Sequence, residues 1–416
     1  MSQFRFRCTE CGAFYEEAEA ELTCPACARA QQPGGVVRGV LEVAIESLPG
    51  AWPAAPPSSP DFLRAFLPLS KSGPLPPIPV GGTPLLDVPH LRRATGMKDL
   101  WVKDDTRNPS GSTKDRASLL VVAKALEYGR ETIATASTGN AATALAAVSA
   151  AAGVRAVVFV PATAPEAKLV QMQSYGALVL PIEGTYDQAF ELCLEACRAF
   201  GWYNRNTAVN PFTMEGKKTV ALEIAASLAP AAIDAVLVPT GDGVILAGVA
   251  KGFADLERCG LLPRKPRLIA VQPEGSAAIV NALRTGAPTI VPLPGAASVA
   301  DSLTVETPRN ALPCLAAVRS SGGGGIAVSD SAIVAAIADL AKLTGVFAEP
   351  AGAAVLAGLR VALEQNLVGR DERVVLLVTG TGLKDIPAAA RAVKRPAPIP
   401  AKLDAVAERL RSLPAE

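Results

Sequence analysis

The chain has 416 residues, half of them apolar and only 5% aromatic, which is enough for about two to three domains or one large α/β unit with attachments. Its 40 basic and 39 acidic side chains leave a formal charge of +1, so no long-range field favours nucleic acid or an anionic membrane as a partner. The most apolar stretch, 140–165, is interrupted by Gly153, Arg155 and Pro161, too early for a membrane span of about 20 residues. The first residues lack the apolar core of a signal peptide, and we expect a cytoplasmic protein.

Two Cys-x-x-Cys pairs lie near the N-terminus, Cys8 with Cys11 and Cys24 with Cys27. Each pair places two thiolates on one tight turn, and two such turns predict a four-sulfur zinc site in a ribbon-like unit of residues 1–32. Iron and unliganded thiols are the alternatives. A closed four-cysteine site has no open coordination position, which indicates a role in folding or docking. The segment between the pairs carries four glutamates, so we do not expect this unit to bind nucleic acid.

The proline-rich segments 49–60 and 73–84 predict an extended connection, after which β-rich and helical runs alternate. Such alternation predicts parallel sheets with helices on both faces. A last amphipathic helix, with Leu403, Val406 and Leu410 at helical spacing, is expected to cover the large domain or to serve an interface. The expected strands lie at 100–103, 132–136, 154–160, 177–182, 235–239, 267–271 and 374–378, and the expected helices at 114–129, 140–152, 165–175, 185–200, 215–228, 244–258 and 350–364.

Seven strands exceed one small sheet, so the sequence predicts two subdomains with a cleft between them. In parallel sheets, ligands bind beyond the C-terminal ends of the strands. Four of these ends are followed by loops rich in glycine and small polar residues, at 108–113, 137–140, 240–243 and 379–385. These loops predict a rim that binds anionic and polar ligands.

Two of these loops have a direct chemical interpretation. At 240–243 an open backbone precedes a helix, and the N–H groups and dipole of a helix N-terminus bind phosphate. This loop has neither the dinucleotide-binding pattern nor the Walker A pattern. At 137–140 two hydroxyls, a side-chain amide and free N–H groups suit a carboxylate. Ordinary helix capping is the alternative for either loop taken alone.

Lys114 stands where the loop 108–113 becomes a helix. The positive end of the helix dipole opposes protonation of its amine, and a neutral amine can attack an aldehyde to form a Schiff base. A solvated surface lysine is the alternative. The single histidine, His90, lies in a proline-bounded connection, so a hydrolytic Ser–His or Cys–His pair has no obvious base.

The motifs NPSGSTKDR, ASTGN, VPTGDG, VQPEGSAA, DSLTVETPRN, FAEPAGAA and VTGTGLKD occur in this order. Together they resemble the fold-type II pyridoxal-phosphate enzymes, and most closely the threonine synthases that carry an N-terminal zinc ribbon. The resemblance runs from residue 8 to about 390 and implies a homodimer with an α/β fold of the tryptophan synthase β type, in which two doubly wound parallel-sheet subdomains flank a cleft. The implied large, PLP-binding subdomain is 33–105 with 222–395, the small one is 106–221, and a C-terminal helix occupies 396–416.

The resemblance also implies roles for individual residues. Lys114 forms the Schiff base with pyridoxal 5′-phosphate and shuttles protons, and Thr379 faces the pyridine nitrogen. A hydroxyl does not hold a proton on that nitrogen, which favours elimination and replacement chemistry. The implied contacts are Thr240, Gly241, Asp242, Gly243 and Val244 with the cofactor phosphate, Asn140 with the phenolic oxygen, and Ser137, Thr138 and Gly139 with the substrate carboxylate.

The implied reaction converts O-phospho-L-homoserine, a small amino-acid substrate, and water to L-threonine and phosphate. One segment departs from the family pattern, because Thr213 stands where threonine synthases have an arginine that contacts the substrate phosphate. Lys218, Lys217 and Arg205 remain as possible cations for that phosphate. Two related activities stay open, a serine or threonine ammonia-lyase and an O-phosphoserine β-replacement enzyme of the cysteate synthase type. A non-catalytic α/β binding module with a zinc clip is a further alternative.

Overall fold

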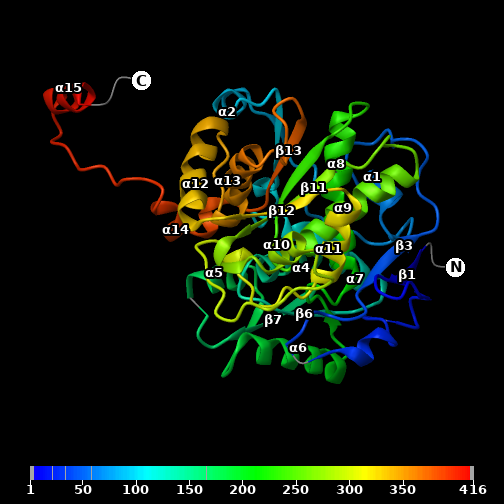
Figure 1. Ribbon diagram of the computed structural model, residues 1–416. Coiled ribbons are helices and arrows are strands. Elements are labelled where there is room, and N and C mark those ends of the chain that lie inside the picture. The colour runs from blue at the N-terminus through cyan, green and yellow to red at the C-terminus, as the bar shows by residue number, and fades with distance from the viewer. Residues whose placement is uncertain (1–3, 21, 33, 58, 165, 413–416) are drawn as a thin grey trace.

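The computed structural model describes residues 4–20, 22–32, 34–57, 59–164 and 166–412, and three sheets organise this part of the chain (Figure 1). The smallest sheet has the antiparallel order β2 (Phe14–Tyr15), β1 (Phe4–Cys8), β3 (Leu41–Ile45). Alternate residues of β1 are buried, as expected for a sheet with one solvated face. Because β3 belongs to this sheet, the N-terminal unit extends beyond the expected boundary at residue 32.

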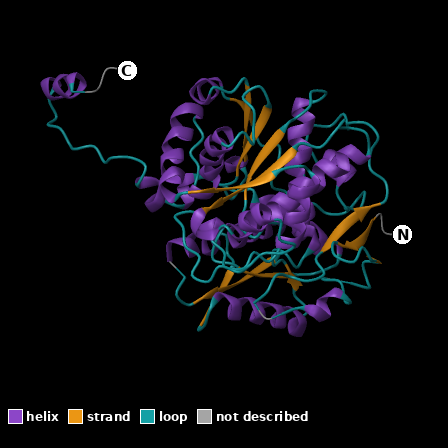
Figure 2. Ribbon diagram, viewed as in Figure 1, coloured by secondary structure: helices purple, strands orange, loops and turns teal. Residues whose placement is uncertain are grey.

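The largest sheet has six strands, and helices cover both of its faces (Figure 2). Its order is β12 (Gly324–Val328), β11 (Arg267–Pro273), β10 (Ala235–Pro239), β13 (Arg373–Val378), β5 (Asp99–Asp104) and β4 (Leu85–Asp87), and only β4 runs antiparallel. Side chains of β10 enter a different hydrophobic cluster on each face, Leu237 on one and Val236 with Val238 on the other. Burial on both faces accounts for the continuous apolar runs of these strands.

The third sheet is fully parallel, in the order β8 (Leu178–Ile182), β7 (Arg155–Pro161), β6 (Thr132–Ala136), β9 (Tyr203–Asn204). The helices of the three units are α1 (Pro60–Phe66), α2 (Pro89–Thr95), α3 (Lys114–Glu127), α4 (Asn140–Ala152), α5 (Glu166–Ser174), α6 (Tyr186–Phe200), α7 (Pro211–Lys217), α8 (Thr219–Leu228), α9 (Val244–Arg258), α10 (Ala278–Thr285), α11 (Ala311–Ser320), α12 (Asp330–Thr344), α13 (Pro350–Glu364), α14 (Ile386–Ala390) and α15 (Leu403–Arg411). Among the described residues, every helix is too short or too polar to cross a membrane.

All seven strands expected from the sequence are present, and six of the seven helices expected between them are single helices. The exception is 215–228, where the chain forms α7 and α8 with a break at Lys218. A Cβ at Gly216 would lie 2.4 Å from the Arg116 carbonyl oxygen. Only glycine at this position therefore allows α7 to pack so closely against the backbone of α3.

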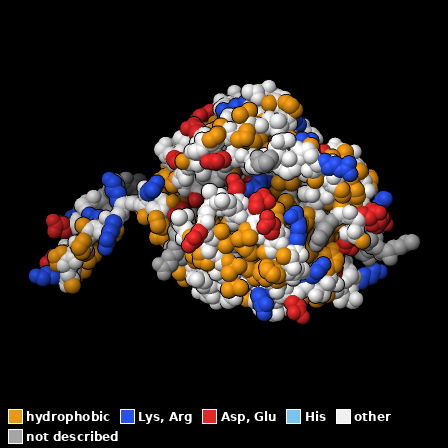
Figure 3. Space-filling model, turned by 90° about the horizontal axis from the view of Figure 1, so that it is seen from below, with side chains coloured by type: hydrophobic (Ala, Val, Ile, Leu, Met, Phe, Trp, Pro, Cys, Tyr) orange, Lys and Arg blue, Asp and Glu red, His pale blue; other side chains and the backbone are white. Residues whose placement is uncertain are grey.

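The C-terminal helix α15 does not cover the body of the protein. It stands away from the rest of the chain in two views at right angles (Figures 1 and 3). Its apolar residues Leu403 and Leu410 are 83% and 61% exposed. One of the two roles expected for this helix, covering the large subdomain, is therefore wrong.

Candidate active site

A cavity of about 500 Å³ opens where the C-terminal ends of β6 and β10 face each other. Loops from the two parallel sheets line it, 137–140 after β6 and 240–244 after β10, together with Lys114 from α3. A further segment, 301–309, closes one side. The cleft expected between two subdomains is present. The loops 137–140 and 240–244 meet Lys114 in it.

Lys114 is the first residue of α3 and is partly exposed to the cavity. The loop before it is fixed to the end of β13, because the Thr113 N–H donates to the Thr379 carbonyl oxygen at 2.8 Å. Gly111 has a φ of +83°, and a Cβ there would lie 2.8 Å from Cγ2 of Thr381. The close approach of these two loops therefore requires glycine, and it sets the position of the lysine.

The amine of Lys114 has a pKa lowered to about 8. Burial disfavours the ammonium form, and the Arg205 guanidinium adds repulsion, while the Glu349 and Asp242 carboxylates oppose these effects. A large fraction of such an amine is neutral near pH 8, as attack on an aldehyde requires. From the sequence, we expected the helix dipole to lower this pKa, whereas burial is the main cause in the structure.

Behind Lys114, Arg116 anchors the start of α3 from within the protein. Its guanidinium donates from Nε and Nη2 to the two carboxylate oxygens of Asp105, both at 2.8 Å. It also pairs with Glu223, which accepts from Lys103 Nζ at 2.6 Å. All four side chains are buried, so they form a paired and hydrogen-bonded cluster that fixes α3 to β5 and α8.

The loop 240–244 combines an open backbone with a helix N-terminus. Gly243 has a φ of +94° and directly precedes α9, whose first N–H groups have no partners within the helix. A Cβ at Gly241 would lie 3.1 Å from the carbonyl oxygen of Ser302. The Asp242 carboxylate accepts from the Arg309 N–H at 3.2 Å, which joins this loop to the 301–309 segment. The loop has the properties of a phosphate site.

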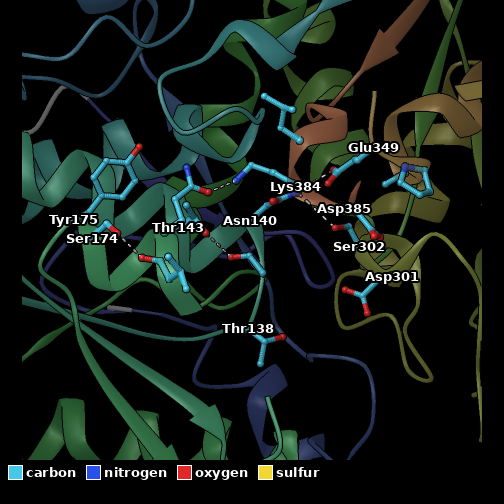
Figure 4. A pocket seen from close by; sticks show the side chains of 16 residues that line it. Thr138, Asn140, Thr143, Ser174, Tyr175, Asp301, Ser302, Glu349, Lys384 and Asp385 are labelled. Atoms are coloured by element: carbon cyan, nitrogen blue, oxygen red, sulfur yellow. Dashed lines mark hydrogen bonds between the residues drawn. The ribbon is translucent and has the colours of Figure 1, made fainter. Parts of the chain in front are cut away.

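Asn140 begins α4 and points toward a buried carboxylate that sequence reasoning missed (Figure 4). Its Nδ2 donates to the two oxygens of Glu349 at 2.9 and 3.1 Å. Burial raises the pKa of Glu349. Both residues line a second cavity, also of about 500 Å³, which shares 138–140 with the first and includes Lys384, whose Nζ donates to Gln171 at 3.1 Å.

Three of the predicted residues, Thr379, Thr213 and Lys218, lie outside the residues that line either cavity. Thr379 is buried beside the Lys114 loop through its bond to the Thr113 N–H. The Thr213 hydroxyl is fully buried and donates to the Asn210 carbonyl oxygen at 2.8 Å. The role of Thr379 toward a pyridine nitrogen stays a prediction, while Thr213 offers no free polar group to a ligand.

The structure separates the two neighbouring lysines at the end of α7. Lys218 is directed away from the cleft into a buried cluster, where its Nζ pairs with Glu215 and, at 2.8 Å, with Asp255. Lys217 lines the cavity instead. The predicted contact of Lys218 with a substrate is not supported by this placement, because its ammonium already has two carboxylate partners.

The four N-terminal cysteines converge as predicted. Their sulfur atoms all lie within 4.8 Å of one another, and the pairs Cys8–Cys27 and Cys11–Cys24 are both 3.8 Å apart. A tetrahedral zinc with Zn–S distances of about 2.3 Å places its sulfurs about 3.8 Å apart. The donor set and its spacing fit a structural zinc ion.

The cleft also fits a cofactor that carries an aldehyde and a phosphate. An amine of lowered pKa faces the cavity at Lys114, and a glycine-containing helix N-terminus lies across from it at 240–244. Asn140 offers a side-chain amide at the rim. A volume of about 500 Å³ lies in the usual range for cofactor sites.

The fold and the cleft are those of a pyridoxal-phosphate dependent enzyme. The family model described as "Pyridoxal-phosphate dependent enzyme" matches residues 78–380. Solved structures share the fold: the processed form of threonine deaminase isoform 2 from Solanum lycopersicum, at 23% identity and a TM-score of 0.67, covers 84% of this chain and 98% of its own. Maize serine racemase, at 23% identity and a TM-score of 0.64, covers 72% and 88%.

Within this class, the chain belongs to the threonine synthase family. The threonine synthase of Methanosarcina acetivorans is 36% identical over 97% of this chain and 98% of its own length. That of Methanocaldococcus jannaschii is 35% identical over 98% and 99%. The family expected from the order of the motifs is confirmed, as is the fold class.

Proposed function

We propose that this protein is a threonine synthase, which converts O-phospho-L-homoserine and water to L-threonine and phosphate. The observation that carries the proposal is the position of Lys114, whose amine of lowered pKa faces a cleft with a phosphate-binding loop on its other side. Similarity to threonine synthases over nearly the whole chain supports this reaction.

Lys114 is the residue to which we assign the proton transfers. Pyridoxal phosphate, when bound, supplies an aldehyde for this amine and an electron sink that makes the substrate protons at Cα and Cβ removable. Lys114 takes the Cα proton, a Cβ proton is then removed, and the Cγ–O bond breaks as its electron pair leaves with phosphate. Protons return to Cγ and Cα, and water adds its hydroxyl at Cβ and releases its remaining proton. Its lowered pKa keeps the amine able to accept a proton near neutral pH.

The loops of the rim bind and orient the reactants in this proposal. Backbone and hydroxyl groups of 240–244 hold the cofactor phosphate, and Thr379 faces the pyridine nitrogen. Asn140 contacts the phenolic oxygen, and its bonds to Glu349 fix the amide in position. The substrate carboxylate is received by Ser137, Thr138 and Gly139. Ser137 lines the first cavity, and the other two residues line both cavities.

We also propose a structural zinc ion at Cys8, Cys11, Cys24 and Cys27, supported by the spacing of the four sulfur atoms. The homodimer and the cytoplasmic location expected from the sequence remain proposals. The resemblance to threonine synthases supports the dimer.

The reaction is tested by incubating the purified protein, loaded with pyridoxal phosphate, with O-phospho-L-homoserine. We expect phosphate and threonine in equal amounts, and a visible absorbance band at about 410–420 nm, the range of a lysine-bound cofactor. Lys114→Ala should lose both, while Lys342→Ala, which removes an exposed lysine, should keep both. Phosphate release without threonine, or a wild-type protein that stays colourless, contradicts the proposal.

The neutral Thr213, which takes the place of an arginine, keeps a second activity under consideration. A site without a phosphate-binding cation would favour elimination from serine or threonine over a phosphorylated substrate. The same preparation is therefore offered both hydroxyamino acids. Pyruvate or 2-oxobutanoate formed faster than threonine would assign the protein as an ammonia-lyase.

A further inference from the structure

The C-terminal tail, residues 391–412, carries a third of the large apolar side chains that the described chain exposes. Of fifteen such side chains, five lie in this tail: Val393, Ile399, Leu403, Val406 and Leu410. In α15, Leu403, Val406 and Leu410 recur at helical spacing, so they form one apolar stripe along the helix. No residue of α15 is buried, so the fold leaves this stripe uncovered.

A helix of this kind is not expected to be stable by itself. The nine residues of α15 are fewer than an isolated helix needs in water, where most helical stability comes from packing of the apolar face. No side chain caps the N-terminus of α15, so local hydrogen bonds add little. The sequence and the structure together indicate that α15 packs on another surface.

A matching apolar surface lies on the rim of the second cavity (Figure 4). Val170 of α5 and Leu383 line this cavity and are 53% and 71% exposed. Ile386, the first residue of α14, is also exposed. So is Phe347, whose carbonyl oxygen accepts from the N–H of Gly382 at 2.9 Å. We call Val170, Phe347, Leu383 and Ile386 the rim patch.

The charge of the tail is opposite to that of this rim. Between residues 391 and 412 the tail has six basic and two acidic side chains. Lys402 and Arg409 are seven residues apart, and so they lie on one side of the helix, next to the apolar stripe. Opposite charges guide two surfaces together and fix their register. In the described part of the chain, three carboxylates and one lysine line the second cavity: Asp301, Glu349, Asp385 and Lys384.

The linker before α15 directs this helix toward a second copy of the chain. Residues 391–402 start at the end of α14, next to the rim patch, and contain Pro396, Pro398 and Pro400. A proline-rich linker is a semi-rigid spacer of about 3.1 Å per residue, so this segment spans roughly 35 Å. Figure 1 shows it running away from the body of the protein. To reach the rim patch of its own chain, α15 would need this linker to reverse direction, whereas the patch of a neighbouring copy needs no reversal.

We propose that α15 of one copy packs its apolar stripe on the rim patch of a second copy, and that two copies exchange their tails in this way. A two-fold axis makes the two contacts identical, and exchange of an element between protomers is a low-cost route to a dimer. In such a pair, each tail covers the rim of the other copy's cleft. The proposal goes beyond the proposed reaction and does not depend on it.

Cross-linking between two distinguishable copies tests this contact. One full-length chain carries Leu410→Cys and an affinity tag, and the other carries Ile386→Cys without a tag. The two are mixed and treated with a short bismaleimide. We expect a product that contains one chain of each kind, with the two introduced cysteines joined, as identified by mass spectrometry.

Arg155→Cys in place of Ile386→Cys is the matched control for this experiment. Arg155 is exposed and begins β7, so it lies at the end of the parallel strands opposite the cleft, and it should give no such product. Mixed wild-type chains give the background from the native cysteines.

The position of the link separates tail exchange from its alternatives. A single chain that carries both Leu410→Cys and Ile386→Cys and links only within itself would show that α15 folds back on its own rim patch, which overturns the exchange. If the mixed single variants react with a monofunctional maleimide but do not link to each other, α15 does not dock on the rim patch at all.

Sedimentation equilibrium measures how much the contact contributes to the dimer. Leu403→Ser and Leu410→Ser should each raise the dissociation constant of the dimer about tenfold or more, because each removes a leucine buried in the contact. Glu408→Gln is the control, since this residue lies two positions after Val406 and so on the opposite side of α15. A wild-type protein that is monomeric, or leucine variants that dimerise as tightly as the wild type, would contradict the exchange.

These outcomes are separable from that of the proposed function. If the enzyme forms threonine but its copies do not cross-link through α15, the reaction stands and the tail exchange is wrong. If the copies cross-link and no threonine is formed, the tail exchange stands and the reaction is wrong.

Discussion

The Glu349 carboxylate is placed to influence both the lysine and the amide of the cleft. It accepts from Asn140 and is buried at the start of α13. A Cβ at Gly380 would lie 2.3 Å from its Oε1, so it also touches the segment that follows β13. Its negative charge raises the pKa of Lys114 against the larger effect of burial.

Removal of this charge should make Lys114 deprotonate at lower pH. In the apoenzyme, the rate of pyridoxal-phosphate uptake should increase with pH around a midpoint near 8, the pKa of Lys114, because only the neutral amine attacks the aldehyde. In Glu349→Gln the midpoint should move down, since an anion that favours the ammonium form is lost. Stopped-flow absorbance measures the rate. A wild-type midpoint near 10, or an unchanged midpoint in the variant, contradicts this assignment.

At the scale of single elements, the loops at the strand ends form the site, and Gly243, just before α9, is constrained both by its backbone conformation and by its neighbours. Its φ of +94° is unfavourable for any residue with a side chain, and a Cβ there would lie 2.7 Å from Cβ of Cys314 and 3.0 Å from the Asn310 carbonyl oxygen. Gly243→Ala should therefore displace the start of α9, lower stability by about 1–3 kcal/mol, and weaken pyridoxal-phosphate binding about tenfold or more.

Gly153→Ala provides the matched control for this prediction. Gly153 also has a positive φ, +69°, but nothing lies within 4 Å of a Cβ at that position, which ends α4 far from the 240–244 loop in sequence. It should lower the midpoint of urea unfolding and leave cofactor affinity unchanged. If both variants lose cofactor to the same extent, general destabilisation and not the loop geometry is the cause.

Strand and loop positions could be predicted because parallel strands carry continuous apolar runs and their C-terminal ends meet at one edge. The strand β12 was missed because it is glycine-rich, and its neighbour Gly323 is needed where a Cβ would lie 1.9 Å from the Leu268 carbonyl oxygen. Lys217 and Lys218 could not be ranked, since neighbouring helical residues differ in direction by about 100°. Glu349 was missed because its contact with Asn140 joins residues 209 positions apart.

At the scale of the whole molecule, the N-terminal sheet is packed against the helix that carries Lys114. Phe4 and Phe6 contact Phe212 of α7 edge-to-face, with ring centroids 5.8 and 5.6 Å apart. The ammonium of Lys124 in α3 lies 5.0 Å from the Phe4 ring centroid and 5.4 Å from that of Phe212. The cysteine cluster closes the far end of this sheet, where a Cβ at Gly39 would lie 2.9 Å from that of Cys24.

Removal of zinc should consequently destabilise the whole protein and not only its N-terminal unit. Since the metal binds the folded arrangement of sulfurs, we expect a chelator to lower the stability by about 3–4 kcal/mol, as for a ligand held at several hundred times its Kd. Thermal unfolding with and without chelator, together with the zinc content by atomic emission, measures the effect. Cys24→Ala should lose the metal and the response to chelator, whereas Cys259→Ser, outside the cluster, should keep both. A metal-free wild-type protein with an unchanged Tm would show that the sheet needs no metal and is held by its aromatic packing alone.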